Sequence, residues 1–139
     1  MTSVCALPPA LPGERFDVDG LCWYTAGQGP PLLLVHSVNA AASAAEVRPL
    51  YDAFSATRTV FAIDLPGYGF SDRSERAYTP RLMTDALHAV AAQIRKRCGL
   101  GAGAAIDALA VSLGCEFMAR AAAEQPALWG RLALVSPPA

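Results

Sequence analysis

The fold is decided by residues 106–114, which read Ile-Asp-Ala-Leu-Ala-Val-Ser-Leu-Gly. The apolar run 106–111 predicts a buried strand, and the segment 114–124 that follows predicts a helix. Ser112 lies between them, with small residues, Ala110 and Gly114, two positions before and two after it. A chain that turns this sharply from strand to helix needs small side chains there, because larger ones would collide. The pattern therefore predicts a strand–turn–helix unit with the Ser112 hydroxyl at the top of a sheet.

Strands and helices alternate on both sides of this unit. Apolar runs bounded by turn residues predict three more buried strands, at residues 32–35, 59–63 and 132–135. Helical spacing of apolar residues predicts a helix after each of the first two strands, the second one starting at Thr79 and ending at Gly99. This order is typical of right-handed βαβ units. The predicted fold class is α/β, a mostly parallel sheet flanked by helices with its ligands at the carboxyl ends of the strands.

Local signals add detail before the first buried strand and after it. Residues 16–26 alternate around Asp19-Gly20, two residues that tolerate positive φ, and predict a β-hairpin. Ser43 and Glu46 have the spacing of a capping box, which predicts a helix start. Pro49 is tolerated best in the first turn, so we expect that helix to begin later than the box suggests.

Composition limits the classes of protein that this chain can be. The chain has 139 residues, of which 53% are hydrophobic and 17% charged, with a formal net charge of −1. These values predict one domain and exclude a disordered segment. We expect no nucleic-acid partner without a basic patch, and no membrane span from such short apolar runs. Residues 1–14 are rich in proline and predict an irregular lead-in, followed by a single domain at 15–139.

The four cysteines, at positions 5, 22, 98 and 115, form no C-x-x-C pair, and the two histidines lie far apart. The sequence therefore predicts no metal site and no cofactor. The thiols are interpreted as small buried hydrophobic groups in a reducing compartment. The N-terminus lacks a basic segment followed by an apolar one, so no secretory signal is predicted and the expected location is cytoplasmic.

Two interpretations of Ser112 remain open on the pentapeptide alone. In one, the serine is a nucleophile, and the free amides of the following helix stabilise a developing oxyanion. In the other, Ser112 simply caps the helix, as serine commonly does. A cap would have β-region angles and an Oγ bonded to an amide two or three residues on, whereas a nucleophile would have unusual angles.

Three further segments accompany the serine turn. They are Leu-Val-His at 34–36, Asp-Leu-Pro-Gly-Tyr-Gly-Phe-Ser-Asp at 64–72, and Leu-Val-Ser-Pro at 134–137. With residues 110–114 they resemble the α/β-hydrolase superfamily, over the chain from about residue 14 onward. The likeness is to the branch of esterases, lipases and carbon–carbon hydrolases. Ser112 argues against the similar dehalogenases and epoxide hydrolases, whose nucleophile is an aspartate.

The resemblance implies a role for each residue of the site. Ser112 would attack the carbonyl of a small-molecule acyl substrate, and the backbone N–H groups of Val38 and Leu113 would bind the oxyanion. The supporting loop would be formed by His36, Ser37 and Asn39, with Ser37 where the family usually has glycine. His36 is interpreted as a structural residue that ties this loop to neighbouring backbone.

Other polar residues receive structural interpretations. Asp64 and Asp72 could act as acids, but the resemblance implies that they fix the loop after the second buried strand. That loop lacks the residues of a phosphate-binding loop. Cys115 is expected to pack at the helix start and is a weak alternative nucleophile. His88 lies within a helical pattern and is interpreted as a surface or packing residue.

The family's triad runs in the order serine, acid, histidine, and no histidine follows His88 in this sequence. The expectation is a truncated chain: an incomplete α/β-hydrolase core without the last strands and lid, inactive by itself. Its last strand is then an apolar edge, at which we expect self-association. The alternative function is a non-catalytic binding or interaction module that keeps the α/β scaffold.

Overall fold

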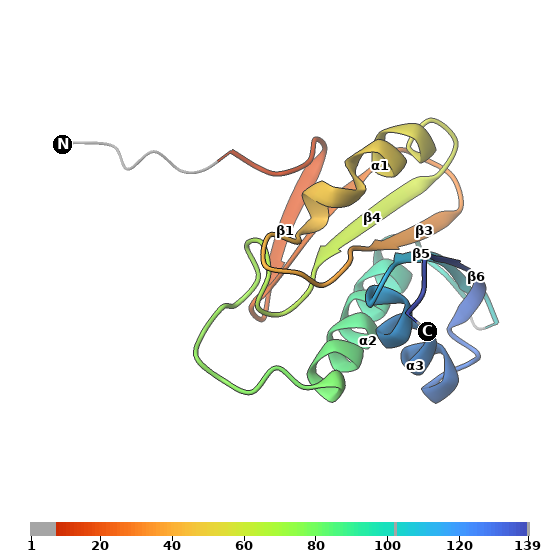
Figure 1. The fold of residues 1–139 in the computed structure, drawn as a ribbon. Coiled ribbons are helices and arrows are strands. Elements are labelled where there is room, and N and C mark those ends of the chain that lie inside the picture. The colour runs from red at the N-terminus through yellow and green to blue at the C-terminus, as the bar shows by residue number, and fades with distance from the viewer. Residues whose placement is uncertain (1–7, 102, 139) are drawn as a thin grey trace.

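The computed structural model describes residues 8–101 and 103–138. Its sheet has six strands in the order β1-β2-β4-β3-β5-β6, with helix α1 on one face and helices α2 and α3 on the other (Figure 1). The strands are β1 Glu14–Val18, β2 Leu21–Ala26, β3 Pro31–Val35, β4 Thr59–Asp64, β5 Ile106–Val111 and β6 Trp129–Val135. The helices are the 3-10 turn η1 Ala44–Val47, α1 Arg48–Phe54, α2 Pro80–Arg97 and α3 Gly114–Glu124.

The sheet is mixed, and its parallel part is the one predicted. β4, β3, β5 and β6 run parallel, whereas β1 and β2 form an antiparallel hairpin joined to β4. Asp19 and Gly20 both have positive φ at the tip of this hairpin, 51° and 81°, as a two-residue turn between strands requires. The α/β class and the hairpin are therefore confirmed.

Both faces of the sheet are buried, which explains the continuous apolar runs in the sequence. Successive side chains of a strand point to opposite faces. Accordingly, Leu33 packs in the cluster under α2 and α3, while Leu32 and Leu34 pack in the cluster under α1. The loops at the carboxyl ends of the parallel strands are therefore attached to a well-packed core.

The segment after β3 differs from its prediction. Ser43 accepts a hydrogen bond from the Ala45 amide at 3.2 Å and caps η1, and the α-helix begins only at Arg48, with Pro49 in its first turn. The late start is confirmed. The capping box is wrong, because the Glu46 carboxylate turns away and bonds to Ser37 instead.

The two ends of the described chain also bear on the predictions. Residues before β1 pack on the domain: Leu11 is buried, and the Tyr51 hydroxyl donates to the Pro12 carbonyl at 2.7 Å. At the other end, β6 is an edge strand on which Leu134 and Val135 are 42% and 43% exposed. Self-association through this edge stays a prediction.

Among the described residues, no helix combines the length and the apolar character that crossing a bilayer requires.

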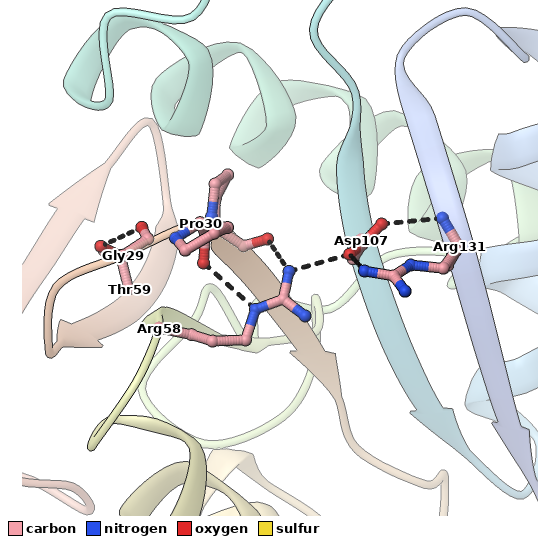
Figure 2. Close-up of polar contacts among 7 residues, drawn as sticks. Gly29, Pro30, Arg58, Thr59, Asp107 and Arg131 are labelled. Atoms are coloured by element: carbon pink, nitrogen blue, oxygen red, sulfur yellow. Dashed lines mark hydrogen bonds and ion pairs between the residues drawn. The ribbon is translucent and has the colours of Figure 1, made fainter.

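A polar cluster ties the amino ends of the parallel strands together (Figure 2). Arg58 donates to the Asp107 carboxylate at 2.8 Å and to two carbonyls at the start of β3. The same carboxylate accepts the Arg131 amide at 2.8 Å, beside a register shift between β5 and β6. A Cβ on Gly130 would lie 2.6 Å from this carboxylate. The Asp107 side chain thus supplies an acceptor where the β5–β6 ladder is irregular.

We expect Asp107→Asn to lower the free energy of unfolding by about 1–3 kcal/mol at neutral pH, because charge-assisted hydrogen bonds are lost. Burial opposes ionisation, but the hydrogen bonds from Arg58 and Arg131 lower the pKa of Asp107. The stabilisation is present above the unfolded pKa of about 3.9 and is lost as pH falls through the lower folded pKa. Urea unfolding at neutral and acid pH, with the exposed Asp17→Asn as control, measures this. Equal stability of Asp107→Asn and the unmodified chain at neutral pH would contradict it.

Candidate active site

Ser112 occupies the turn between β5 and α3 in a conformation that is unusual for serine. Its φ is 53°, and its amide donates to the Val135 carbonyl at 2.8 Å. The residue at the helix N-cap is Leu113, and the cap has no side-chain hydrogen bond. The sharp turn with unusual backbone angles is therefore confirmed. The helix-cap interpretation of Ser112 is contradicted, because neither its position nor its φ is that of an N-cap.

The small residues around Ser112 have distinct structural reasons. A Cβ on Gly114 would lie only 2.4 Å from the His36 carbonyl oxygen, so the start of α3 touches the loop after β3. Ala110 is fully buried, and its carbonyl accepts a hydrogen bond from the Cys115 thiol at 3.2 Å. This close approach brings the turn of Ser112 next to the loop that begins at His36.

His36 is buried and hydrogen-bonded to backbone through both ring nitrogens. Its Nε2 accepts the Leu65 amide at 3.0 Å, which leaves the proton on Nδ1, 2.5 Å from the Ser37 carbonyl oxygen. Burial lowers the pKa of His36, which favours this neutral form. Because both nitrogens are engaged, His36 ties the loop after β3 to the first residue after β4, Leu65, and is not placed to take a proton.

The polar side chains of the loop bond to one another. The Asn39 amide group donates to Ser37 Oγ at 3.1 Å, and its oxygen accepts the Ala41 amide at 3.1 Å. Positive φ outside glycine occurs, within the described ranges, only at Asp19, Ser112 and Ser136. Ser37 therefore adopts the loop conformation without the strain that would demand glycine.

The two backbone amides expected to bind an oxyanion lie at the carboxyl ends of adjacent strands. Val38 follows β3 and Leu113 follows β5, and these strands pair in parallel. Neither amide donates to an acceptor within the part of the chain that the structure describes. The two amides thus follow neighbouring strands at one edge of the sheet, and their role as oxyanion donors stays a prediction.

The loop after β4 is built around Asp64, which is fully buried. Its carboxylate accepts the Ala44 amide at 2.7 Å and the Phe70 amide at 3.0 Å. Ser71 Oγ donates to the Asp64 carbonyl and accepts the Cys22 amide at 2.8 Å. Asp64 therefore holds the loop in place, and the amides around it are already used.

A family model described as the alpha/beta hydrolase fold matches residues 30–139 of the sequence. The chain belongs to the α/β-hydrolase fold family. It is 31% identical over 112 residues to the pimeloyl-[acyl-carrier protein] methyl ester esterase of Xylella fastidiosa (strain 9a5c), covering 81% of this chain and 38% of that protein.

Solved structures of α/β hydrolases share the arrangement of this chain. An α/β-hydrolase fold protein from Burkholderia ambifaria has a TM-score of 0.73 and 27% identity, with 91% of this chain and 44% of that chain covered. E-2-(acetamidomethylene)succinate hydrolase has a TM-score of 0.70 and 26% identity, with 86% and 42% covered. The chain spans less than half of each relative, and its sheet is an incomplete α/β-hydrolase core.

The other candidates for a nucleophile or a base in this α/β-hydrolase-fold chain have structural contacts. Cys115 is 2% exposed, and burial raises the pKa of its thiol, which makes it a poor nucleophile. His88 on α2 bonds through Nε2 to Glu124 on α3 at 3.0 Å, so it joins two helices. Cys22 and Cys98 are also free thiols, and Cys5 lies outside the described residues. No cluster of metal-ligating side chains occurs in the described part.

Proposed function

We propose that this chain is the nucleophile-bearing, N-terminal part of a serine hydrolase that acts on an ester or a related acyl substrate. The observation that carries the proposal is the backbone of Ser112, whose φ of 53° lies at the strand–helix turn. Such a conformation costs about 1–3 kcal/mol in a residue other than glycine and clusters at functional sites. The name of the curated relative, a methyl ester esterase, agrees with this substrate class.

In the proposed reaction, Ser112 Oγ forms a bond to the acyl carbon, and the carbonyl π electrons move to oxygen. The N–H groups of Val38 and Leu113 stabilise the resulting oxyanion. The oxyanion then re-forms the carbonyl, the bond from the acyl carbon to the alcohol oxygen breaks, and the alcohol leaves with the proton given up by Ser112. Water attacks the acyl-serine in the same way, releasing the acid and returning a proton to Ser112 Oγ. His36, Ser37 and Asn39 form the loop that carries the first of these amides. On this proposal residues 15–139 form the domain, with residues 1–14 leading into it.

The Ser112 proton needs a base, and neither histidine of the sequence is in a position to act as one. His36 bonds to backbone through both ring nitrogens, and His88 bonds through Nε2 to Glu124 between α2 and α3. A serine hydrolase without its triad base retains roughly 10³–10⁴-fold catalysis over water, from the oxyanion hole and binding. In a partial domain we expect that residual contribution to be lost as well, so the chain by itself should turn over an activated aryl ester at a rate close to background. The cytoplasmic location also stays a prediction.

Covalent labelling tests the assignment of Ser112. Excess fluorophosphonate is expected to add slowly to Ser112 Oγ, forming an O–P bond while fluoride leaves and the proton passes to solvent. Intact mass and peptide mapping should locate one label, which Ser112→Ala abolishes. Ser136→Ala is the matched control, because Ser136 follows β6 with a similar φ of 52°. Equal labelling of the unmodified chain and Ser112→Ala would overturn the proposal.

A further inference from the structure

Glu46 binds one residue of the loop after β3 with both carboxylate oxygens. Oε1 accepts the Ser37 amide at 2.7 Å, and Oε2 accepts the Ser37 hydroxyl at 2.6 Å. Glu46 belongs to η1, nine positions along the chain, whereas Ser37 is 8% exposed and lies one residue before Val38. A single carboxylate thus holds both the backbone and the side chain of Ser37.

The third polar group of Ser37 is also held. Its carbonyl oxygen lies 2.5 Å from the protonated Nδ1 of His36. This carbonyl shares a peptide plane with the Val38 N–H, and no peptide bond in the described chain is cis. In a planar trans peptide the C=O and N–H point in opposite directions. Fixing the Ser37 carbonyl toward His36 therefore also fixes the direction of the Val38 N–H.

We propose that Glu46 is a positioning residue for the oxyanion loop. It holds the amide and hydroxyl of Ser37 in place, so that the Ser37 carbonyl stays on His36 and the N–H on the other side of that peptide, which belongs to Val38, points at the carbonyl oxygen of the substrate. This inference rests on the proposed function of Ser112. Glu46 does not touch the reacting atoms. Its effect passes through Ser37, and it removes the need to reorganise the loop as negative charge develops on the substrate oxygen.

The charge of the surroundings suits this role. Burial opposes ionisation of Glu46, but the hydrogen bonds from the Ser37 hydroxyl and amide lower the pKa of the carboxyl. Glu46 is therefore an anion at neutral pH, and anions make the stronger hydrogen bonds. His36 faces it in the neutral form, and Asp64 binds the amide of Ala44 on the same turn.

The test measures the rate of fluorophosphonate labelling of Ser112 in the 139-residue chain, separating the maximal inactivation rate from the apparent affinity for the reagent. In Glu46→Ala we expect the maximal rate to fall about 10–100-fold, with the apparent affinity unchanged. This decrease is no larger than the roughly 100–1000-fold decrease that follows removal of one oxyanion donor. Glu46→Gln keeps an acceptor for the Ser37 amide, so it should restore part of the rate. Asp52→Asn removes an exposed carboxylate from α1 and should have no effect.

The outcomes separate this inference from the proposed function. Labelling of Ser112 in the unmodified chain at an unchanged maximal rate in both Glu46 variants overturns the role of Glu46 and leaves the nucleophile intact. Absence of Ser112 labelling in the unmodified chain overturns both. If the role of Glu46 is purely structural, its variants are less stable but label at the same rate once folded. Amide NMR spectra measure the folded fraction of each variant, to which the labelling rate is referred. If Glu46→Ala does not fold, the rate of Glu46→Gln decides.

Discussion

Replacing Gly114 with alanine is expected to lower the free energy of unfolding by about 2–4 kcal/mol, toward and beyond the upper end of the usual range for overpacking, because the clash is with backbone. The added Cβ would lie 2.4 Å from the His36 carbonyl oxygen and 3.3 Å from a methyl group of Val35. Neither neighbour is the end of a flexible side chain, so α3 and the loop after β3 must move apart. Thermal unfolding monitored by circular dichroism should show a midpoint lower by about 10 °C.

The sign of this effect is informative. Gly114 is the first residue of α3 and has no positive φ, so local preference alone favours alanine by about 0.4–1 kcal/mol. Gly101→Ala is the matched control, because no non-neighbouring atom of the described residues lies within 4 Å of a Cβ there. We expect that control to be neutral or slightly stabilising. A stabilising Gly114→Ala would show that α3 does not touch the loop in solution.

Asp64→Ala is expected to cost about 2–5 kcal/mol, because one buried and one part-buried amide lose their acceptor at once. The Ala44 amide at the start of η1 and the Phe70 amide in the loop after β4 would both remain unpaired. The carboxylate also fills the space beside Gly69, where a Cβ would lie 2.2 Å from it. Urea unfolding at neutral pH measures the loss.

Two further variants calibrate the Asp64 measurement. Asp64→Asn can accept from only one of the two amides, so its loss should fall between those of Asp64→Ala and the unmodified chain. Glu75→Ala removes an exposed carboxylate from the same loop and should change stability by less than about 0.5 kcal/mol. A loss of under 1 kcal/mol in Asp64→Ala would mean that other groups or water satisfy the two amides.

The strands inside the sheet, which are covered on both faces, were predicted accurately. The bounds of the edge strand β6 were predicted poorly. The run 59–63 led to β4 within one residue, because a strand covered on both faces is apolar throughout. The start of β6 was missed, since residues 129–131 include Gly130 and Arg131. The Arg131 amide bonds to the Asp107 carboxylate, which reaches it from the neighbouring strand β5.

The candidate site shows a similar division. The small residues around Ser112 predicted the sharp turn, because steric crowding within five residues is a local matter. Glu46 was assigned to a capping box, since its spacing from Ser43 fits one. The structure pairs it with Ser37, whose amide is buried and has to find an acceptor. No pattern in the sequence marks that contact.

The sequence by itself determined the order and type of the elements, the α/β class and the strand–serine–helix turn, because apolar periodicity and turn residues act over a few positions. The tertiary structure alone decided the sheet order β1-β2-β4-β3-β5-β6, the burial of Asp64 and the approach of Gly114 to His36. It also decided which carboxylate serves which amide. These choices follow from which polar groups lose water when the sheet and helices pack, and that is settled only by residues distant along the chain.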